Sequence, residues 1–141
     1  MRITAHLHRA HGALTTLSNG RHAWQADVDK TLGSTDLAPD PHDLLDSALA
    51  ACTTLTLELY IRRRQLAVTD LRVSITHTET RDETGRVHYT LDRQIEIDGA
   101  LSDADRQRLL EIAGKCPIHR LLEGEIVVNS ALVPATTSPA P

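Results

Sequence analysis

The chain has 141 residues, which suits a single domain, and 40% of them are hydrophobic, enough to form a packed core. Only 2% are aromatic and none is Phe, which argues against modules that stack nucleic-acid bases on aromatic rings. The formal net charge of −4 and the scattered basic residues also argue against a nucleic-acid-binding surface. The one basic run, Arg62-Arg63-Arg64, is typical of a solvated helix end.

The sequence favours a cytoplasmic protein with neither a membrane nor a nucleic acid among its partners. No apolar run reaches the roughly 18 residues that span a bilayer, and residues 1–10 lack the apolar core of a signal peptide. Because cytosolic thiols are kept reduced, a disulfide between the only two cysteines, Cys52 and Cys116, would be catalytic or sensing rather than a passive crosslink.

Three short strands are predicted in the first third of the chain, at residues 2–8, 13–17 and 22–28. The Asn19-Gly20 pair between the last two is a strong hairpin signal. Trp24 is expected in the core of this sheet, with a place in a pocket wall as the alternative.

The clearest element is a helix from Pro41 to about Gln65, preceded by a polar loop. Asp40 suits the N-cap, Pro41 the first helical position, and Asp43 the third, where a carboxylate meets the positive helix end. Apolar residues occur on nearly all sides of this helix. A helix of that kind is buried, and in a domain this small we expect it to be buried between two subunits.

The second half alternates strands and helices, in the order strand 71–79, turn 82–85, strand 87–97, helix 102–113, short helix 116–122 and final strand 126–133. The whole pattern predicts an α+β fold with antiparallel sheet packed on helices. Residues 1–133 form the single domain, and the Pro-rich residues 134–141 are predicted to be a disordered tail.

Each cysteine has a structural and a chemical interpretation. Cys52 lies in the middle of the long helix, where a free cysteine commonly packs as a small apolar side chain. Cys116 precedes Pro117 at a helix start, where backbone N–H groups favour a thiolate, and Lys115 and His119 are close in sequence. Cys116 as a simple helix cap is the equal alternative.

Two segments carry a resemblance to a known family. Residues 41–52 (PHDLLDSALAAC) resemble the central-helix motif of the OsmC/Ohr family of osmotically induced and organic hydroperoxide resistance proteins, which runs from a Pro through an acidic position and small residues to Ala-Cys. Residues 115–119 (KCPIH) are similar to the second motif, a Cys-Pro at a helix start. With the order of strands and helices, the resemblance covers residues 1–133.

The resemblance implies an intertwined homodimer, in which antiparallel sheets wrap long central helices and active sites lie at the interface. It also implies a cysteine-based peroxidase that serves the oxidative stress response without a cofactor or metal. Cys52 would be the peroxidatic thiolate that becomes a sulfenic acid, and Cys116 the resolving thiol that forms a disulfide with it. A dithiol, such as a lipoylated protein, would then reduce the pair.

The family also supplies an Arg from the N-terminal strands and a Glu at the start of the central helix. Arg9 looks like the matching Arg, and Arg21 is a weaker candidate. His42 stands where the Glu is usual, and Asp43 follows it. Asp43 either orients Arg9 or supports the helix start. It precedes Cys52 by nine residues, which is roughly 13 Å along a helix, so it would act across the dimer or through Arg9.

Two other functions stay open. A metal-binding protein would use His6, His8 and His11, or Cys116 with His119. A non-catalytic dimer would bind an apolar small molecule and use Cys52 only for packing. For the peroxidase, an apolar pocket predicts that bulky organic hydroperoxides react faster than hydrogen peroxide.

Overall fold

The computed structural model describes residues 1–134, so the predicted tail, apart from its first residue, lies outside the described residues. The fold is α+β, as predicted. Its elements are β1 (Thr4–Leu7), 3₁₀ turn η1 (Arg9–His11), β2 (Thr15–Ser18), β3 (Ala23–Ala26), 3₁₀ turn η2 (Lys30–Leu32), α1 (Pro41–Arg64), β4 (Val68–Arg81), β5 (Val87–Gly99), α2 (Asp103–Ala113) and α3 (Pro117–Glu123).

Helix α1 begins and ends where its sequence indicates. Asp40 accepts a hydrogen bond of 2.9 Å from the backbone N–H of Asp43, and the Asp43 carboxylate accepts one of 3.2 Å from the backbone N–H of Asp40. This reciprocal pair is a capping box, which satisfies two N–H groups that the helix leaves free. At the other end Gln65 adopts a left-handed conformation with φ of 52°, and the preceding arginines meet the negative helix end.

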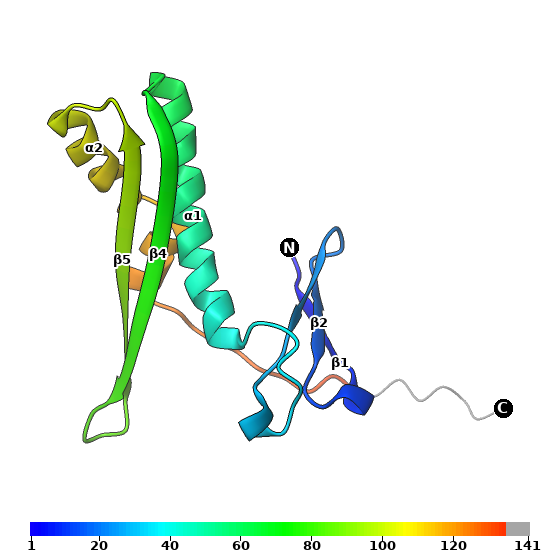
Figure 1. Cartoon of the computed structure of the whole chain (residues 1–141). Helices are drawn as coiled ribbons and strands as arrows, with labels where there is room; N and C mark the ends of the chain where they lie inside the picture. Colours follow the sequence, from blue (N-terminus) through cyan, green and yellow to red (C-terminus); the bar gives the residue numbers. More distant parts are fainter. Residues whose placement is uncertain (135–141) are drawn as a thin grey trace.

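The core lies where α1 meets the β4–β5 hairpin and α2. The two strands pair antiparallel along their whole length, and Figure 1 shows α1 running alongside β4. The fully or nearly buried cluster consists of Leu57 and Ile61 from α1 and Leu109 and Ala113 from α2. Alternate residues of the hairpin pack against this cluster. The alternation of apolar and polar residues in strands 71–79 and 87–97 predicts this.

The N-terminal sheet, in the order β1-β2-β3, stands apart from the middle of α1 (Figure 1). Its connection to α1 is organised by Asp27, a buried carboxylate that accepts hydrogen bonds from Thr35 Oγ1 at 2.8 Å and from the Leu37 backbone N–H at 3.1 Å. Hydrogen bonds of this kind, first of all the one from Ser34, hold the pKa of Asp27 far below its usual range.

The expected burial of α1 between two subunits is not tested by a single chain, and the expected core position of Trp24 is wrong for it. The buried residues of α1 all lie on one side, while Leu55 and Leu59 on the other side are 64% and 62% exposed. Trp24 is 36% exposed rather than in a core. The physical reason is the same in both cases, because within the described residues one face of α1 and the outlying sheet have nothing of their own chain to cover them.

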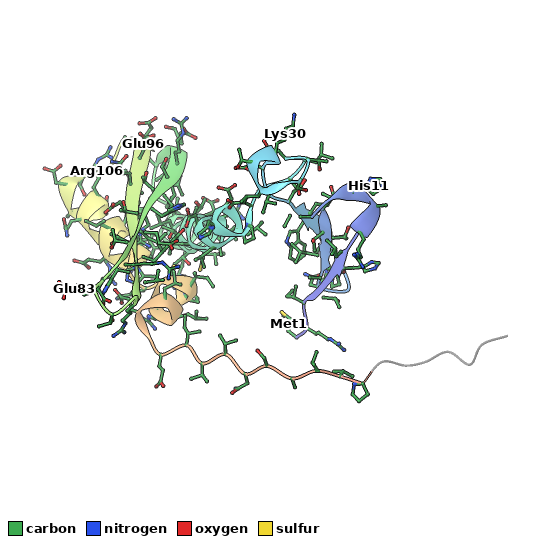
Figure 2. The ribbon with its side chains drawn as sticks, turned by 90° about the horizontal axis from the view of Figure 1, so that it is seen from below. Met1, His11, Lys30, Glu83, Glu96 and Arg106 are labelled. Atoms are coloured by element: carbon green, nitrogen blue, oxygen red, sulfur yellow. The ribbon has the colours of Figure 1, made fainter. Side chains whose placement is uncertain are left out.

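The predicted final strand is also wrong for the single chain. Residues 126–133 are extended but pair with no strand among the described residues. A strand is defined by hydrogen bonds to a neighbour, and the β4–β5 hairpin and the N-terminal sheet leave this segment outside both ladders. Figure 2 shows it crossing from α3 toward the N-terminal sheet, with Val127 and Val128 68% and 82% exposed.

By length and hydropathy alone, α1 could cross a membrane, although it has no uninterrupted apolar run of that length. Core helices pass the same criterion. In the described chain α1 contacts β4, α2 and α3, and 22% of its apolar window is buried.

The adjacent residues Leu109 and Leu110 test this core directly, because Leu109 is fully buried and Leu110 is 57% exposed. We expect Leu109→Ala to lower the free energy of unfolding by about 2–5 kcal/mol, and Leu110→Ala to lower it by less than about 0.5 kcal/mol. Urea unfolding at one fixed protein concentration measures both. Equal losses would contradict the described packing of α2.

Candidate active site around two cysteines

Cys116 is fully buried at the point where α3 meets α1. It is the N-cap of α3, because its Sγ accepts a hydrogen bond of 3.3 Å from the backbone N–H of His119. The same sulfur lies 3.9 Å from Oγ1 of Thr53 on α1. The structure therefore confirms the helix-start position of Cys116 and adds a contact with the central helix.

Cys52 is the residue directly before Thr53, so Cys116 contacts the residue that follows the other cysteine in sequence. Consecutive residues of a helix are about 100° apart around its axis, and Cys52 is half-buried whereas Thr53 is fully buried. Both cysteines are free thiols in this structure. Cys116 thus contacts the residue next to Cys52, and the disulfide between the two cysteines stays a prediction.

Arg93 on β5 joins the cysteine region to the sheet. Its Nη1 donates to Thr53 Oγ1 at 3.0 Å, and its Nη2 contacts His119 Nδ1 at 3.1 Å. A guanidinium can only donate, so Nδ1 of His119 must be unprotonated. The single ring proton of His119 is therefore on Nε2, which lies 2.9 Å from Oε1 of Glu123. The chain of contacts fixes the tautomer of His119 and leaves Arg93 with two uncharged partners.

Sequence reasoning missed Arg93 and Thr53. A signal was present in β5, where Tyr89, Leu91, Ile95 and Ile97 share the inward face with Arg93 between them. A charged residue at an inward position of an alternating strand is unusual, and it marks the place where β5 meets the candidate site.

A second polar cluster surrounds Asp46 near the start of α1. Its carboxylate accepts a hydrogen bond of 2.9 Å from the Tyr89 hydroxyl and is also hydrogen-bonded to His77 Nδ1. Burial, assisted by Asp46, raises the pKa of Tyr89 to about 12. His42 packs against Tyr89 with ring centroids 6.0 Å apart and pairs with Glu79 at 3.4 Å. His42 thus joins an aromatic stack in this chain.

The structure does not bring Arg9, Arg21 or Asp43 to Cys52 within one chain. Arg9 is exposed in η1, and Arg21 is exposed between β2 and β3. Figure 2 shows His11, the last residue of η1, on the side of the N-terminal sheet away from α1. Asp43 forms the capping box. Its support of the helix start is therefore observed, and a catalytic role for any of the three stays a prediction.

Two of the residues proposed for a metal, His8 and His119, have other partners. Nε2 of His8 is 2.7 Å from Thr16 Oγ1, and the ring of His119 lies between Arg93 and Glu123. The described residues contain no group of three or more His, Cys, Asp or Glu side chains placed to hold a metal ion.

A cavity of about 230 Å³ opens beside this region. It is lined by Leu49, Tyr89, Leu91, Arg93, His119, Leu122 and Glu123. Its walls therefore combine aliphatic side chains of α1 and β5 with Arg93, whose guanidinium contacts Thr53 beside Cys116.

Comparison with known proteins identifies the family of the chain. Residues 33–131 match the family model described as OsmC-like protein. The chain belongs to the OsmC-like protein family. No curated protein sequence matches the chain.

Solved structures of OsmC-like proteins share the fold at low sequence identity. An OsmC-like protein from Mycoplasma pneumoniae has a TM-score of 0.74 at 22% identity, over 87% of this chain and 86% of that one. An organic hydroperoxide resistance protein OsmC from Legionella pneumophila has a TM-score of 0.66 at 17% identity, over 87% and 88%. The organic hydroperoxide resistance protein OhrB of Bacillus subtilis has a TM-score of 0.63 at 20% identity, over 87% and 90%.

The Asp46–His77 pair gives this OsmC-like protein a testable pH dependence. The hydrogen bond to Asp46 raises the pKa of His77 above its ordinary value of 6.5. A raised pKa means that the folded state favours protonated His77. The stabilisation is therefore complete below about pH 6.5 and is lost as the pH rises through the higher folded-state pKa.

We expect an NMR titration to place the His77 pKa above 6.5, and Asp46→Asn to return it toward 6.5. His22→Gln, at an exposed turn position, is the control. Identical His77 titrations in wild type and Asp46→Asn would contradict the pairing.

Proposed function

We propose that this OsmC-like protein is a cysteine-based organic hydroperoxide reductase. The supporting observation is the position of Cys116, whose sulfur lies 3.9 Å from the hydroxyl of the residue that follows Cys52.

In the proposed cycle, Cys52 attacks the terminal peroxide oxygen as a thiolate and the O–O bond breaks. The alcohol leaves, and Cys52 becomes a sulfenic acid. The Cys116 thiol then displaces water to form a disulfide. A cytoplasmic dithiol, such as a lipoylated protein, reduces the disulfide and is itself oxidised.

The difference in exposure supports this assignment of roles. Cys52 is half-buried, whereas Cys116 has no exposed surface. A peroxide therefore reaches Cys52 first. The resolving thiol is held by α3 until the sulfenic acid forms.

We also propose that the functional unit is an intertwined homodimer. The exposed aliphatic side of α1, the outlying N-terminal sheet and the unpaired segment 126–133 each lack a covering surface within the described chain. A second copy supplies one for all three. In this arrangement Arg9, which is remote from the cysteines of its own chain, stabilises the thiolate of the other copy. Asp43, fixed at the start of α1, is then placed to orient that arginine.

The peroxidase cycle is tested by mass spectrometry before and after one equivalent of cumene hydroperoxide. We expect wild type to lose the mass of two hydrogen atoms through a Cys52–Cys116 disulfide, and Cys116→Ser to carry a trapped sulfenic acid on Cys52. Cys52→Ser is the control that should not react.

Absence of change in wild type would favour the non-catalytic alternative, a dimer that binds an apolar molecule. The replacement of the family's usual Glu by His42 favours that alternative. A further requirement of the proposal is faster reaction with cumene hydroperoxide than with hydrogen peroxide.

The dimer is tested at the exposed side of α1, where Leu59 is 62% exposed in the single chain. We expect Leu59→Asp to shift the protein from dimer to monomer in light scattering, because a carboxylate would be buried without a partner. Val87→Asp, at the hairpin tip and 43% exposed, should leave the dimer intact. A wild-type protein that scatters as a monomer would refute the dimer.

A further inference from the structure

Three groups surround the buried hydroxyl of Thr53, and they decide where its proton lies. A hydroxyl has one proton to donate and two lone pairs that accept. The Leu49 carbonyl, 2.8 Å from Thr53 Oγ1, can only accept, and the Arg93 guanidinium, 3.0 Å from it, can only donate. Thr53 therefore donates its proton to Leu49 and accepts from Arg93. One lone pair of the oxygen is left, and Thr53 has no exposed surface through which water could reach it.

The second lone pair faces the thiol of Cys116. The sulfur of Cys116 also has no exposed surface. It lies 3.9 Å from Thr53 Oγ1 and accepts a hydrogen bond of 3.3 Å from the backbone N–H of His119. Of these two partners only the Thr53 oxygen can accept, because an N–H group only donates. The S–H group of Cys116 therefore donates to Thr53. Even a weak donor such as S–H gains from a partner where water has no access.

This arrangement stores Cys116 as a thiol rather than as a thiolate. A helix start, taken alone, favours a thiolate through its backbone N–H groups. A thiolate here would face a lone pair of Thr53 across 3.9 Å, unless Thr53 turned its proton away from Leu49. Arg93 donates to the hydroxyl oxygen rather than to the sulfur. A fully buried anion would then keep one N–H donor, and burying a charge with so little compensation is costly.

The contacts close into a ring that holds the sulfur from two sides. Arg93 donates to the Thr53 hydroxyl and, at 3.1 Å, to Nδ1 of His119. The backbone N–H of His119 donates to Cys116, and the Cys116 thiol donates back to Thr53. The members of this ring come from α1, β5 and α3. The sulfur is thus fixed by the start of α3 and, at the same time, by the residue of α1 that directly follows Cys52.

We propose that Thr53 is a positioning residue for Cys116, whose S–H group it binds, and that it keeps this cysteine protonated against α1 until Cys52 is oxidised. The part that concerns oxidation rests on the proposed peroxidase function. In that step the Cys116 sulfur bonds to the sulfur of the Cys52 sulfenic acid and the S–OH bond breaks. The S–H proton leaves with the hydroxyl group as water. Because the thiolate is the reactive form of a cysteine, a stored thiol also leaves the peroxide to Cys52.

The infrared S–H stretching band tests the hydrogen bond without any peroxide. The reduced Cys52→Ser variant is the background, because Cys116 is then the only thiol of the chain. We expect this variant to show an S–H band at neutral pH. Thr53→Val, which has a similar shape and no hydroxyl, should move the band to higher wavenumber, since its S–H group has lost its acceptor. Thr53→Ser, which keeps the hydroxyl, should leave the band in place.

Thr54→Val is the matched control. The Thr54 hydroxyl likewise donates to the carbonyl four residues earlier, that of Ala50, at 2.9 Å, but the described contacts of the Cys116 sulfur are with other residues. The band should not move in this variant. An identical band in Thr53→Val and Thr53→Ser would overturn the hydrogen bond. Absence of an S–H band from folded Cys52→Ser at neutral pH would also overturn it, whether or not Thr53→Val folds.

The lifetime of the sulfenic acid separates this proposal from the proposed function. In chains that keep both cysteines, dimedone labelling after one equivalent of cumene hydroperoxide measures how long the sulfenic acid on Cys52 lasts. We expect Thr53→Val to lengthen this lifetime about tenfold, which corresponds to one hydrogen bond, and Thr53→Ser and Thr54→Val to keep the wild-type value. An unchanged lifetime in Thr53→Val would refute the positioning role. A band shift without any oxidation of Cys52 would retain the hydrogen bond and refute the peroxidase. Disulfide formation without a band shift would refute the hydrogen bond and retain the peroxidase.

Discussion

One hydroxyl group, that of Thr53, lies where α1, β5 and α3 meet. Its Oγ1 is 2.8 Å from the Leu49 carbonyl, 3.0 Å from Arg93 Nη1 and 3.9 Å from Cys116 Sγ. Thr53 is fully buried, so each of these contacts is made away from water and losing one partner would leave a costly unsatisfied group. Thr53 thus contacts both Cys116 and Arg93, and Arg93 in turn contacts His119.

The single chain has a complete core on one side only. Leu57, Ile61, Leu109 and Ala113 form that core, and every one of them comes from two helices held against the same hairpin. The aliphatic residues on the opposite side of α1 are comparable in number and kind, yet they face solvent in the described chain. A small protein with so few aromatic side chains has little apolar surface to spare, which is why the uncovered side supports assembly with a second copy.

Elements whose causes are local were predictable from the sequence. The capping box, the proline at the first position and the three arginines give α1 its bounds, and all of these lie within a turn of the helix ends. The errors concern contacts with partners that are distant in sequence or that the single chain does not provide. Residues 126–133 have a strand-like pattern without a neighbour, and Trp24 has a core-like side chain on a sheet that covers no core of its own chain. The site shows the same division. Both cysteines could be named from motifs, whereas the contact of Arg93 with Thr53 becomes visible only when β5 is folded against α1.

Cys116 is the N-cap of a seven-residue helix, and in the proposed peroxidase cycle it is also the resolving thiol. Any reaction that takes this sulfur from the His119 N–H removes the cap and leaves a backbone donor without its acceptor. A helix of two turns has little stability of its own, so the covalent state of one atom and the order of α3 are thermodynamically linked. The linkage acts in both directions: contacts that stabilise α3, such as His119 with Glu123, favour the thiol, and loosening α3 favours the oxidised sulfur. In the proposed cycle, the folding free energy of a short helix would thereby form part of the reduction potential of the cysteine pair.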